Sequence, residues 1–372
     1  MHMNKISIWV NILTISVSML ISVLLFFMVD FTFSRFIFPE QQDKVLSSEQ
    51  KPYLEGDNGW YELKPDFMGV DSWGGKVYPV KTDHFGYRVN ERHGAAKAGV
   101  ANVIFLGDSY TYGINGIWSE TFVGMLEGKL ARHVVNAGVS SYSPTVYLYQ
   151  YQKALDEGIL SQGHSVVVAL DISDIQDEAT RWVNGTPHPI LLSPPSKKAD
   201  SEAGLGAKIK SRLLFTQRIR EYLRQSSKEA ADSTIFDIPR SAFTWKKWNL
   251  LDQETFPGGY APLGVSGGIQ RTTAQLTGLD KLVKRNKAKL YFLIYPWPAQ
   301  IKHGTAQMDW ERYINDMCKK LACVGVINTF PAFKKIAENN PLWYKEYFIE
   351  GDVHFSTLGN SVVFGEIART IH

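Results

Sequence analysis

The chain has 372 residues, a formal net charge of +3, and 44% hydrophobic and 21% charged residues. This composition is typical of a folded globular protein and argues against extended disorder. The small net charge, without a basic run interleaved with aromatic residues, argues against nucleic-acid binding. The 10 Trp, 17 Tyr and 20 Phe suit either an aromatic-rich core, which we favour, or a carbohydrate-stacking surface.

The N-terminal segment is the most distinctive feature of the composition. Residues 6–29 contain no charge and are flanked by Lys5 and Asp30. As a helix rising about 1.5 Å per residue, they would span roughly 36 Å, enough to cross a hydrocarbon core. A cleavable signal peptide would have a shorter apolar region, followed by a small-residue cleavage site. An aromatic stretch follows here instead, so we expect residues 1–30 to be an uncleaved membrane anchor.

The orientation of this anchor is indicated by charge and by the two cysteines. Lys5 precedes the apolar segment and Arg35 follows it at a distance, which favours an N-terminus inside and the bulk of the chain in the periplasm or outside the cell. Cys318 and Cys323 would form a disulfide in an oxidising compartment and remain core thiols in the cytoplasm. We favour the disulfide. No clustered His or further Cys suggests a metal site, and no cofactor is expected.

The remainder of the chain falls into two regions. Residues 31–100 are rich in Gly, Pro, Asp and aromatic residues, with short strands expected at residues 77–80 and 87–89, and form a lead-in packed on the main domain. From residue 101 to residue 372, apolar runs alternate with amphipathic stretches. Strands are expected at residues 103–107, 134–139, 166–170, 290–294 and 324–327, and helices at 121–130, 147–155, 276–283, 310–321 and 358–371. This alternation predicts an α/β domain with a parallel sheet covered on both faces.

An insertion at about residues 176–270 interrupts the alternation. It contains several prolines and a basic stretch around Lys208 to Arg224 with helical apolar spacing. Three interpretations stay open for this stretch: a cap over the site, a helix resting on anionic lipid, and an inserted helix with a solvated basic face.

The first chemical motif is Gly107-Asp108-Ser109 at the end of the first expected parallel strand. A serine at a tight turn between strand and helix is accessible, and backbone N–H groups point at whatever lies before it. Such a site lies at the carboxyl ends of the strands in parallel sheets. An Asp-Ser turn or a helix N-cap is the ordinary alternative for these three residues.

The second motif lies at the other end of the same domain. His354 precedes a helix that Ser356 is placed to cap, and Asp352 lies two residues before the histidine. An aspartate in this position can fix the imidazole tautomer through Nδ1. A lone histidine is more often structural, so the pairing with Ser109 is what indicates a catalytic triad.

Together these blocks resemble the SGNH (GDSL-type) hydrolase superfamily over roughly residues 101–372, with the insertion set aside. The resemblance implies a flavodoxin-like three-layer α/β/α sandwich, with Ser109 as nucleophile and His354 and Asp352 completing the triad. It also implies an oxyanion hole made by the N–H groups of Ser109 and Gly138. The third block of the family reads Gly-x-Asn-Asp, but here it is Asp171-Ile-Ser-Asp, so Ser173 replaces the asparagine donor. Losing one such donor costs about 3 kcal/mol, which makes efficient general hydrolysis doubtful.

The chain has a membrane anchor, a domain expected outside the cytoplasm, and an oxyanion hole in which Ser173 replaces the asparagine. In these three features it resembles the cell-envelope members of this superfamily. The resemblance implies transfer or removal of acyl groups, usually acetyl, on cell-envelope polysaccharide through an acyl-Ser109 intermediate, often beside a multi-spanning membrane acyltransferase partner. The aromatic residues Tyr110, Tyr112, Trp182 and Trp297 are candidates for sugar stacking, although core packing is the ordinary role of each. Two alternatives stay open: a membrane-tethered lipase or lysophospholipase, and a catalytically weak glycan-binding or scaffold subunit. The sequence identifies neither the glycan nor the acyl donor.

Overall fold

A computed structural model describes residues 5–36, 51–55, 61–73, 76–90, 99–114, 116–130, 133–181, 263–304 and 309–371. The chain divides into two units, each described here by itself. The basic stretch around Lys208 and most of the predicted insertion lie outside the described residues.

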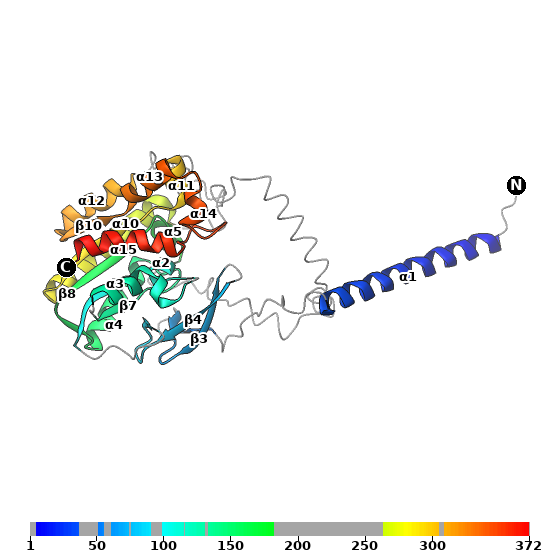
Figure 1. Cartoon of the computed structure of the whole chain (residues 1–372), viewed down its shortest axis with the longest axis horizontal. Helices are drawn as coiled ribbons and strands as arrows, with labels where there is room; N and C mark the ends of the chain where they lie inside the picture. The colour runs from blue at the N-terminus through cyan, green and yellow to red at the C-terminus, as the bar shows by residue number, and fades with distance from the viewer. Residues whose placement is uncertain are drawn as a thin grey trace. The chain divides into compact units, whose positions relative to one another are not determined.

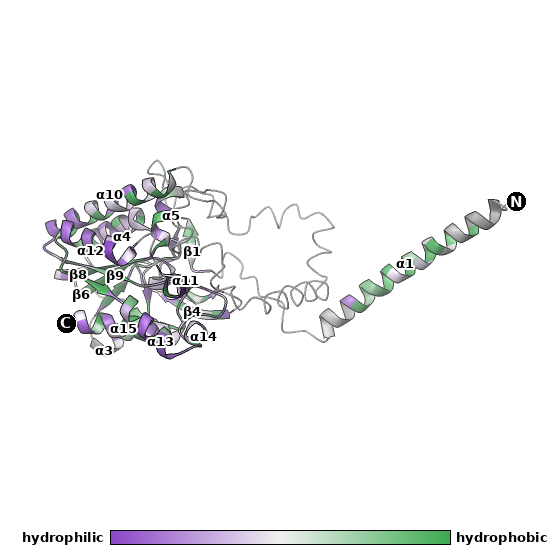
Figure 2. Cartoon of the chain, turned by 90° about the horizontal axis from the view of Figure 1, so that it is seen from above, coloured by the Kyte–Doolittle hydropathy of each residue, from purple (hydrophilic) through white to green (hydrophobic). Residues whose placement is uncertain are grey.

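The described part of the first unit is the helix α1, Lys5–Phe36, drawn in blue in Figure 1. Its Leu13–Asp30 segment is long and apolar enough to cross a membrane. Apolar residues run along much of the helix (Figure 2), and the large side chains from Leu13 to Val29 are exposed. The helix also continues beyond Asp30 without a break, past the end predicted for the anchor. A helix that is apolar on all sides needs an apolar environment, which is compatible with a membrane-spanning role.

The second unit is built on an eight-stranded sheet with the order β10-β9-β8-β6-β7-β5-β4-β3. The five strands from β10 to β7 are parallel, and β5, β4 and β3 extend the sheet antiparallel beyond β7. Numbered along the chain, the parallel strands have the order 2-1-3-4-5, which is the flavodoxin-like arrangement. The strands are β3 (Met68–Trp73), β4 (Lys76–Thr82), β5 (Arg88–Val89), β6 (Ala101–Leu106), β7 (Val134–Asn136), β8 (Leu160–Leu170), β9 (Lys289–Ile294) and β10 (Gly325–Asn328); β1 (Tyr53–Glu55) and β2 (Tyr61–Leu63) form a separate antiparallel pair.

Helices cover both faces of this sheet and make three layers, as Figure 2 shows. One layer contains α4 (Pro144–Asp156), α5 (Ser173–Thr180), α10 (Gly264–Arg285) and α12 (Trp310–Leu321). The opposite layer contains α3 (Phe122–Leu130), α13 (Phe330–Asn339) and α15 (Thr357–Thr370). The shorter helices are α2 (Ser109–Tyr112), η1 (Trp118–Glu120), α11 (Pro298–His303) and α14 (Trp343–Glu346). The strands β6 and β9 and the second half of β8 are almost fully buried because both of their faces are covered.

The predicted strands and helices of the α/β domain are all present, with shifted ends. Two differences concern boundaries. Within the predicted lead-in, β3, β4 and β5 are strands of the main sheet, and β4 and β5 correspond to the strands predicted at 77–80 and 87–89. The insertion is also shorter at both ends than 176–270, because α5 and α10 pack on each other as part of the domain. The glycine at position 268 allows this contact, since a Cβ there would lie 2.2 Å from the carbonyl oxygen of Ile175.

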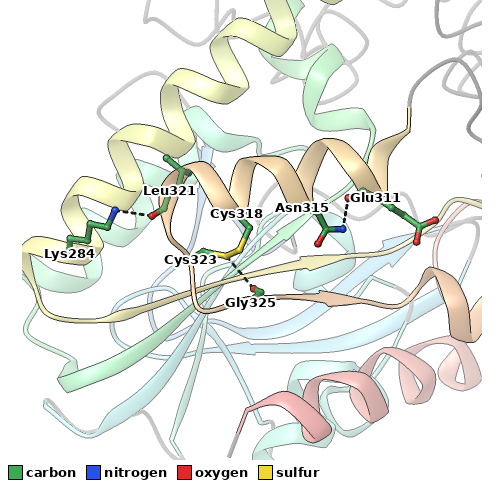
Figure 3. Close-up of a disulfide and its surroundings, with 7 residues drawn as sticks. All are labelled: Lys284, Glu311, Asn315, Cys318, Leu321, Cys323 and Gly325. Atoms are coloured by element: carbon green, nitrogen blue, oxygen red, sulfur yellow. Dashed lines mark hydrogen bonds between the residues drawn. A yellow bond between two sulfur atoms is a disulfide. The ribbon is translucent and has the colours of Figure 1, made fainter.

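The two cysteines are joined by a disulfide between the last turn of α12 and the residue two before β10 (Figure 3). The same helix end receives a hydrogen bond from Lys284 of α10 to the carbonyl oxygen of Leu321, at 2.8 Å. Ala322, just beyond the helix, adopts φ 53°, a left-handed conformation that reverses the chain toward β10. The disulfide therefore holds a tight helix-to-strand turn.

We expect the double substitution Cys318→Ser and Cys323→Ser to lower the free energy of unfolding by about 2 kcal/mol, because the cross-link closes a short loop in the unfolded chain. Thermal unfolding of the full chain in detergent, followed by circular dichroism, measures the change. A reductant should lower the melting temperature of the native chain and leave that of the double variant unchanged. Equal melting temperatures for the two proteins without reductant would contradict a stabilising disulfide.

Candidate active site

Ser109 lies at the topological switch point of the sheet, where the strand order reverses between β6 and β8. The strand β6 ends at Leu106, and Ser109 is the first residue of α2. Crevices outside the carboxyl ends of parallel strands form at such switch points because the connections diverge to opposite faces. The serine hydroxyl is therefore placed where this fold binds ligands.

The short helix α2 is fixed at both ends by local contacts. Asp108 is its N-cap and accepts a hydrogen bond from the N–H of Tyr110 at 3.0 Å. Gly113 ends the helix at φ 81°, a left-handed conformation that glycine adopts without strain. The guanidinium of Arg88, fully buried, donates to the carbonyl oxygens of Tyr112 and Gly113, both at 2.6 Å. Arg88 comes from β5 and was not predicted; nothing in its local sequence marks it as a helix cap.

His354 and Asp352 lie in the loop before α15, and the structure brings both to Ser109. The distance from Ser109 Oγ to His354 Nε2 is 2.7 Å, and that from His354 Nδ1 to Asp352 Oδ1 is 2.5 Å. Ser356 caps α15 through the N–H of Gly359, as predicted, and so fixes the end of the loop. This geometry is that of a Ser–His–Asp triad, with the nucleophile and the acid–base pair 243 residues or more apart in sequence.

The carboxylate of Asp352 is held in its ionised form. Burial by itself raises the pKa of this carboxyl, but the hydrogen bond and the charge of His354 outweigh that effect, and so the pKa lies well below its usual range. The N–H groups of Val353 and His354 also donate to Oδ1, at 2.6 and 3.1 Å. An ionised, fully hydrogen-bonded Asp352 fixes the proton of the neutral imidazole on Nδ1 and leaves Nε2 to accept the serine proton.

Two further side chains contact the triad, and the sequence analysis predicted neither contact. Trp73 of β3 donates its indole N–H to Asp352 Oδ2 at 2.7 Å. Tyr110, the residue after the nucleophile, donates its hydroxyl to the carbonyl oxygen of Val353 at 2.6 Å, and its ring centroid lies 4.6 Å from that of His354. Trp73 carries no recognisable motif, and Tyr110 was considered from the sequence only for sugar stacking, so it is the fold that reveals these contacts.

The predicted oxyanion-hole donors differ in their availability. The N–H of Ser109 is at the first position of α2 and has no acceptor among the described residues. The N–H of Gly138 instead donates to the side-chain oxygen of Asn136 at 3.0 Å. Gly138 is a glycine for a packing reason, since a Cβ there would lie 2.6 Å from Thr111 Cβ and from the N of Tyr112. The Gly138 N–H is thus engaged in this structure.

Ser173 is also engaged, and this weakens the prediction further. Its hydroxyl donates to Asp171 Oδ1 at 2.5 Å, and its N–H donates to the same oxygen at 2.7 Å. A serine hydroxyl has one proton to donate, so Ser173 offers no donor to an oxyanion in this arrangement. The other oxygen of Asp171 accepts the indole N–H of Trp297 at 2.9 Å.

The loop after β7 contains the N–H groups that remain open. The N–H groups of Val139 and Tyr142 bond to the carbonyl oxygens of Gly107 and Val139. Those of Ser140 and Ser141 have no acceptor among the described residues. Ser141 also adopts φ 64°, which is uncommon for a residue with a side chain. The N–H of Ser143, at the end of the loop, likewise has no acceptor among the described residues. A second backbone donor from this loop would therefore come from Ser140, Ser141 or Ser143 unless the bond at Gly138 breaks.

Three buried carboxyl groups lie beneath the switch point: Asp108, Asp171 and Asp174. Burial raises the pKa of each, and repulsion between the three raises the pKa of Asp108 and Asp174 well above the usual range. Asp174 accepts the hydroxyl of Tyr147 at 2.9 Å and the N–H of Asp171 at 3.0 Å. The hydrogen bonds of Asp174 hold the segment after β8 in place. Repulsion between the three carboxylates disfavours the state in which all three are ionised.

We expect Asp174→Asn to become more stable relative to the native chain as pH rises. The pKa of Asp174 is higher in the folded than in the unfolded state. The stabilisation that the native carboxyl provides is therefore complete at pH values below its unfolded-state pKa. It is lost as the pH rises toward its folded-state pKa. Between about pH 5 and pH 8, the difference in unfolding free energy should therefore move in favour of the variant, by at most about 1.4 kcal/mol per pH unit. Denaturant unfolding at the two pH values measures it. Asp316→Asn, at an exposed carboxyl, is the control and should show no such trend; a flat difference for Asp174→Asn would contradict the expected effect.

Three of the aromatic residues considered for sugar stacking are buried: Tyr110, Tyr112 and Trp297. Each has a hydrogen-bonded polar tip within the protein, so core packing is their role. Trp182 lies outside the described residues.

Fold and site together define an α/β protein with a flavodoxin-like sheet and a Ser–His–Asp arrangement at its switch point. No protein-family model matches the chain. No curated protein matches it either. Among solved structures, the chain is similar to a putative lipolytic protein of the G-D-S-L family from Desulfitobacterium hafniense, at 12% identity and a TM-score of 0.37, covering 72% of this chain and 97% of that one.

Two further solved structures show the same similarity. One is a member of the lipolytic G-D-S-L family from Veillonella parvula, with 9% identity, a TM-score of 0.41, and coverage of 72% of this chain and 97% of that one. The other is a variant of Axe2, an acetyl-xylooligosaccharide esterase from a Geobacillus species, with 14% identity, a TM-score of 0.38, and coverage of 74% and 94%. With TM-scores below 0.5, the function of this chain has to be inferred from its own side chains.

Proposed function

We propose that this chain is a serine-dependent acyl-ester enzyme in which Ser109 forms a covalent acyl intermediate. The observation that carries the proposal is the continuous path from Ser109 Oγ through the imidazole of His354 to the ionised Asp352, with distances of 2.7 and 2.5 Å. A buried carboxylate bonded to one nitrogen of a histidine, with a serine hydroxyl on the other, is the arrangement that activates serine as a nucleophile.

The reaction follows from the positions of these groups. His354 Nε2 takes the proton of Ser109 Oγ as the oxygen attacks the carbonyl carbon of the ester. The N–H of Ser109 stabilises the oxyanion, and collapse breaks the ester C–O bond while His354 returns the proton to the leaving alcohol. An acceptor hydroxyl or water then gives its proton to His354 and attacks the acyl-Ser109 carbonyl. Collapse of this second intermediate breaks the bond between the acyl carbon and Ser109 Oγ, and His354 gives its proton to Oγ. This forms the new ester or the free acid and restores the serine hydroxyl.

We propose cell-envelope polysaccharide as the substrate, with an O-acetyl group as the acyl unit transferred or removed. The apolar helix α1 and the Cys318–Cys323 disulfide support a domain tethered to the cytoplasmic membrane and acting outside the cytoplasm. An acyl donor delivered by a multi-spanning membrane acyltransferase fits this placement. A membrane-tethered lipase or lysophospholipase would have the same triad. It would differ from the proposed enzyme in the acyl donor and in the acceptor of the acyl group.

The second candidate is a catalytically weak glycan-binding or scaffold subunit. Its specific support is the oxyanion hole, where the Gly138 N–H and the Ser173 hydroxyl are both bonded within the protein. If the Ser109 N–H, the one predicted donor that is open, acts alone, turnover to water would be about a hundredfold or more below that of a complete hole.

Acyl-enzyme trapping tests the proposed function. The full chain in detergent would be incubated with p-nitrophenyl acetate, quenched in acid and digested, and the peptide containing Ser109 examined by mass spectrometry for an acetyl group. Adding acetyl-free oligosaccharides should increase release of nitrophenol and give acetylated sugar if the enzyme is a transferase. Adding a lysophospholipid instead should have no such effect. An unmodified Ser109 peptide under all these conditions would favour the scaffold role.

A further inference from the structure

The strand β3 contacts the loop that bears Asp352 and His354 and the helix that begins with Ser109, although it lies outside the predicted catalytic domain. Trp73, its last residue, donates to Asp352 Oδ2 at 2.7 Å. Asp71, two residues earlier and so on the same face of the strand, accepts the hydroxyl of Tyr112 at 3.0 Å. Tyr112 is the last residue of α2, the helix that begins with Ser109. One edge strand is thus bonded to the helix bearing the nucleophile and to the loop bearing the acid.

Trp73 completes the hydrogen bonding of the Asp352 carboxylate. Oδ1 accepts from His354 Nδ1 and from the N–H groups of Val353 and His354. Oδ2 has the indole N–H as its one protein donor among the described residues. The indole ring also meets the imidazole edge to face, with centroids 5.2 Å apart and an interplanar angle of 78°. Trp73 therefore restrains both the carboxylate and the imidazole ring from one side.

The hydrogen bonds that hold β3 in place limit the movement of Trp73. Asp71 Oδ2 accepts the hydroxyls of Tyr53 and Tyr78 as well as that of Tyr112, at 3.0, 3.2 and 3.0 Å. The side chain of Asp71 is buried, and all six residues of β3 pair with β4. A donor mounted on a paired strand with a buried polar contact two residues away has little freedom to move, which is what a positioning group requires.

We propose that Trp73 is a positioning residue for the triad, acting through Asp352 to hold the carboxylate and the imidazole in the geometry that activates Ser109. This inference rests on the proposed function. The strand β3, which belongs to the predicted lead-in, would then be a functional part of the active site and not only packing for the α/β domain. Trp73 does not touch the reacting atoms, so its effect has to pass through Asp352 and His354.

The test compares covalent labelling of Ser109 by a fluorophosphonate in full-length variants in detergent. Trp73→Phe keeps an aromatic ring but removes the N–H, and should slow labelling about tenfold or more, as expected for a lost hydrogen bond to a charged group. Trp118→Phe is the matched control, because that indole N–H also donates to a carboxylate, Glu127, at 2.8 Å, and is not part of the triad's contacts. The control should label at the native rate.

Two readouts separate positioning from general damage. The acid limb of the pH–rate profile should move to higher pH in Trp73→Phe, because a carboxylate with one donor fewer attracts the imidazolium more strongly. The nearby acid Asp171 is unchanged in both proteins and cannot cause the difference. In an Asp352→Asn background, Trp73→Phe should cause no further loss, because the indole would face an amide N–H₂ there. If Trp73→Phe does not fold, 3-benzothienylalanine at position 73 keeps the ring shape without the N–H.

The outcomes are distinct. Slower labelling, a shifted acid limb and no additional loss beside Asp352→Asn support the inference. Labelling of the folded Trp73 variants at the native rate, or an equal loss with and without Asp352→Asn, overturns it while leaving the proposed function standing. Absence of labelling in the native chain overturns the proposed function and the inference together.

Discussion

Ser109→Ala should abolish acetyl release from p-nitrophenyl acetate above the background of the detergent solution. In serine enzymes of this mechanism, removal of the nucleophile lowers kcat by about 10⁶-fold, and the residual rate comes from binding and oxyanion stabilisation. Of the three donors predicted for the oxyanion hole, the Ser109 N–H alone is open, so the residual rate should be lower than in an enzyme whose predicted donors are all open. Ser109 is 8% exposed and makes its side-chain bond to His354, so alanine leaves the packing nearly intact.

Steady-state release of nitrophenol by native and variant proteins of equal melting temperature measures this effect. Ser173→Ala is the matched control, since its hydroxyl bonds to Asp171 and not to the triad. That control should retain activity within about tenfold, because no oxyanion donor is removed. A Ser109→Ala enzyme that keeps the native rate would place the reaction elsewhere in the molecule.

Asp352→Ala should lower the rate of acylation by about 10⁴-fold, which is the scale measured for removing the acid of a triad. Alanine removes the acceptor of the Nδ1 proton, so the imidazole is free to rotate and to bind its proton on Nε2. It also leaves the N–H groups of Trp73, Val353 and His354 without their acceptor. The loss therefore combines a wrong tautomer with a disordered loop.

Asp352→Asn should be less damaging than Asp352→Ala for a reason particular to this site. Three N–H donors converge on Oδ1, so the amide oxygen is expected to occupy that position and to keep the proton on His354 Nδ1. The amide N–H₂ then faces Trp73. Stopped-flow acylation rates of the two variants test this order. An asparagine variant as inactive as the alanine variant would show that the charge of Asp352, and not its orientation of the ring, dominates.

The sequence was sufficient for the parts of the fold that depend on local pattern. Alternating apolar runs predicted the parallel strands and their covering helices, and an uncharged run predicted α1. The triad was predictable because Gly107-Asp108-Ser109 and Asp352-x-His354 occupy short segments at opposite ends of one domain. The presence of both segments in one domain is specific for a triad, even though each segment is common by itself.

The parts that were not predicted depend on contacts between distant single residues. Trp73 and Asp352 are 279 positions apart and carry no motif. The strands predicted at 77–80 and 87–89 are present as β4 and β5, but β3 was not predicted. The pairing of these strands with the main sheet was not predicted either, because it is a tertiary effect. Gly138 and Ser173 were assigned from their positions in the motif, but whether an N–H or O–H is open depends on neighbours such as Asn136 and Asp171.

The most direct measurement of the central claim is the intact mass and peptide map of the full chain after treatment with a fluorophosphonate. A single adduct on the peptide that contains Ser109, absent in Ser109→Ala and strongly reduced in Asp352→Ala, is the predicted result. An unmodified native chain with an intact fold, or an adduct that persists in Ser109→Ala, would contradict a triad built on Ser109, His354 and Asp352.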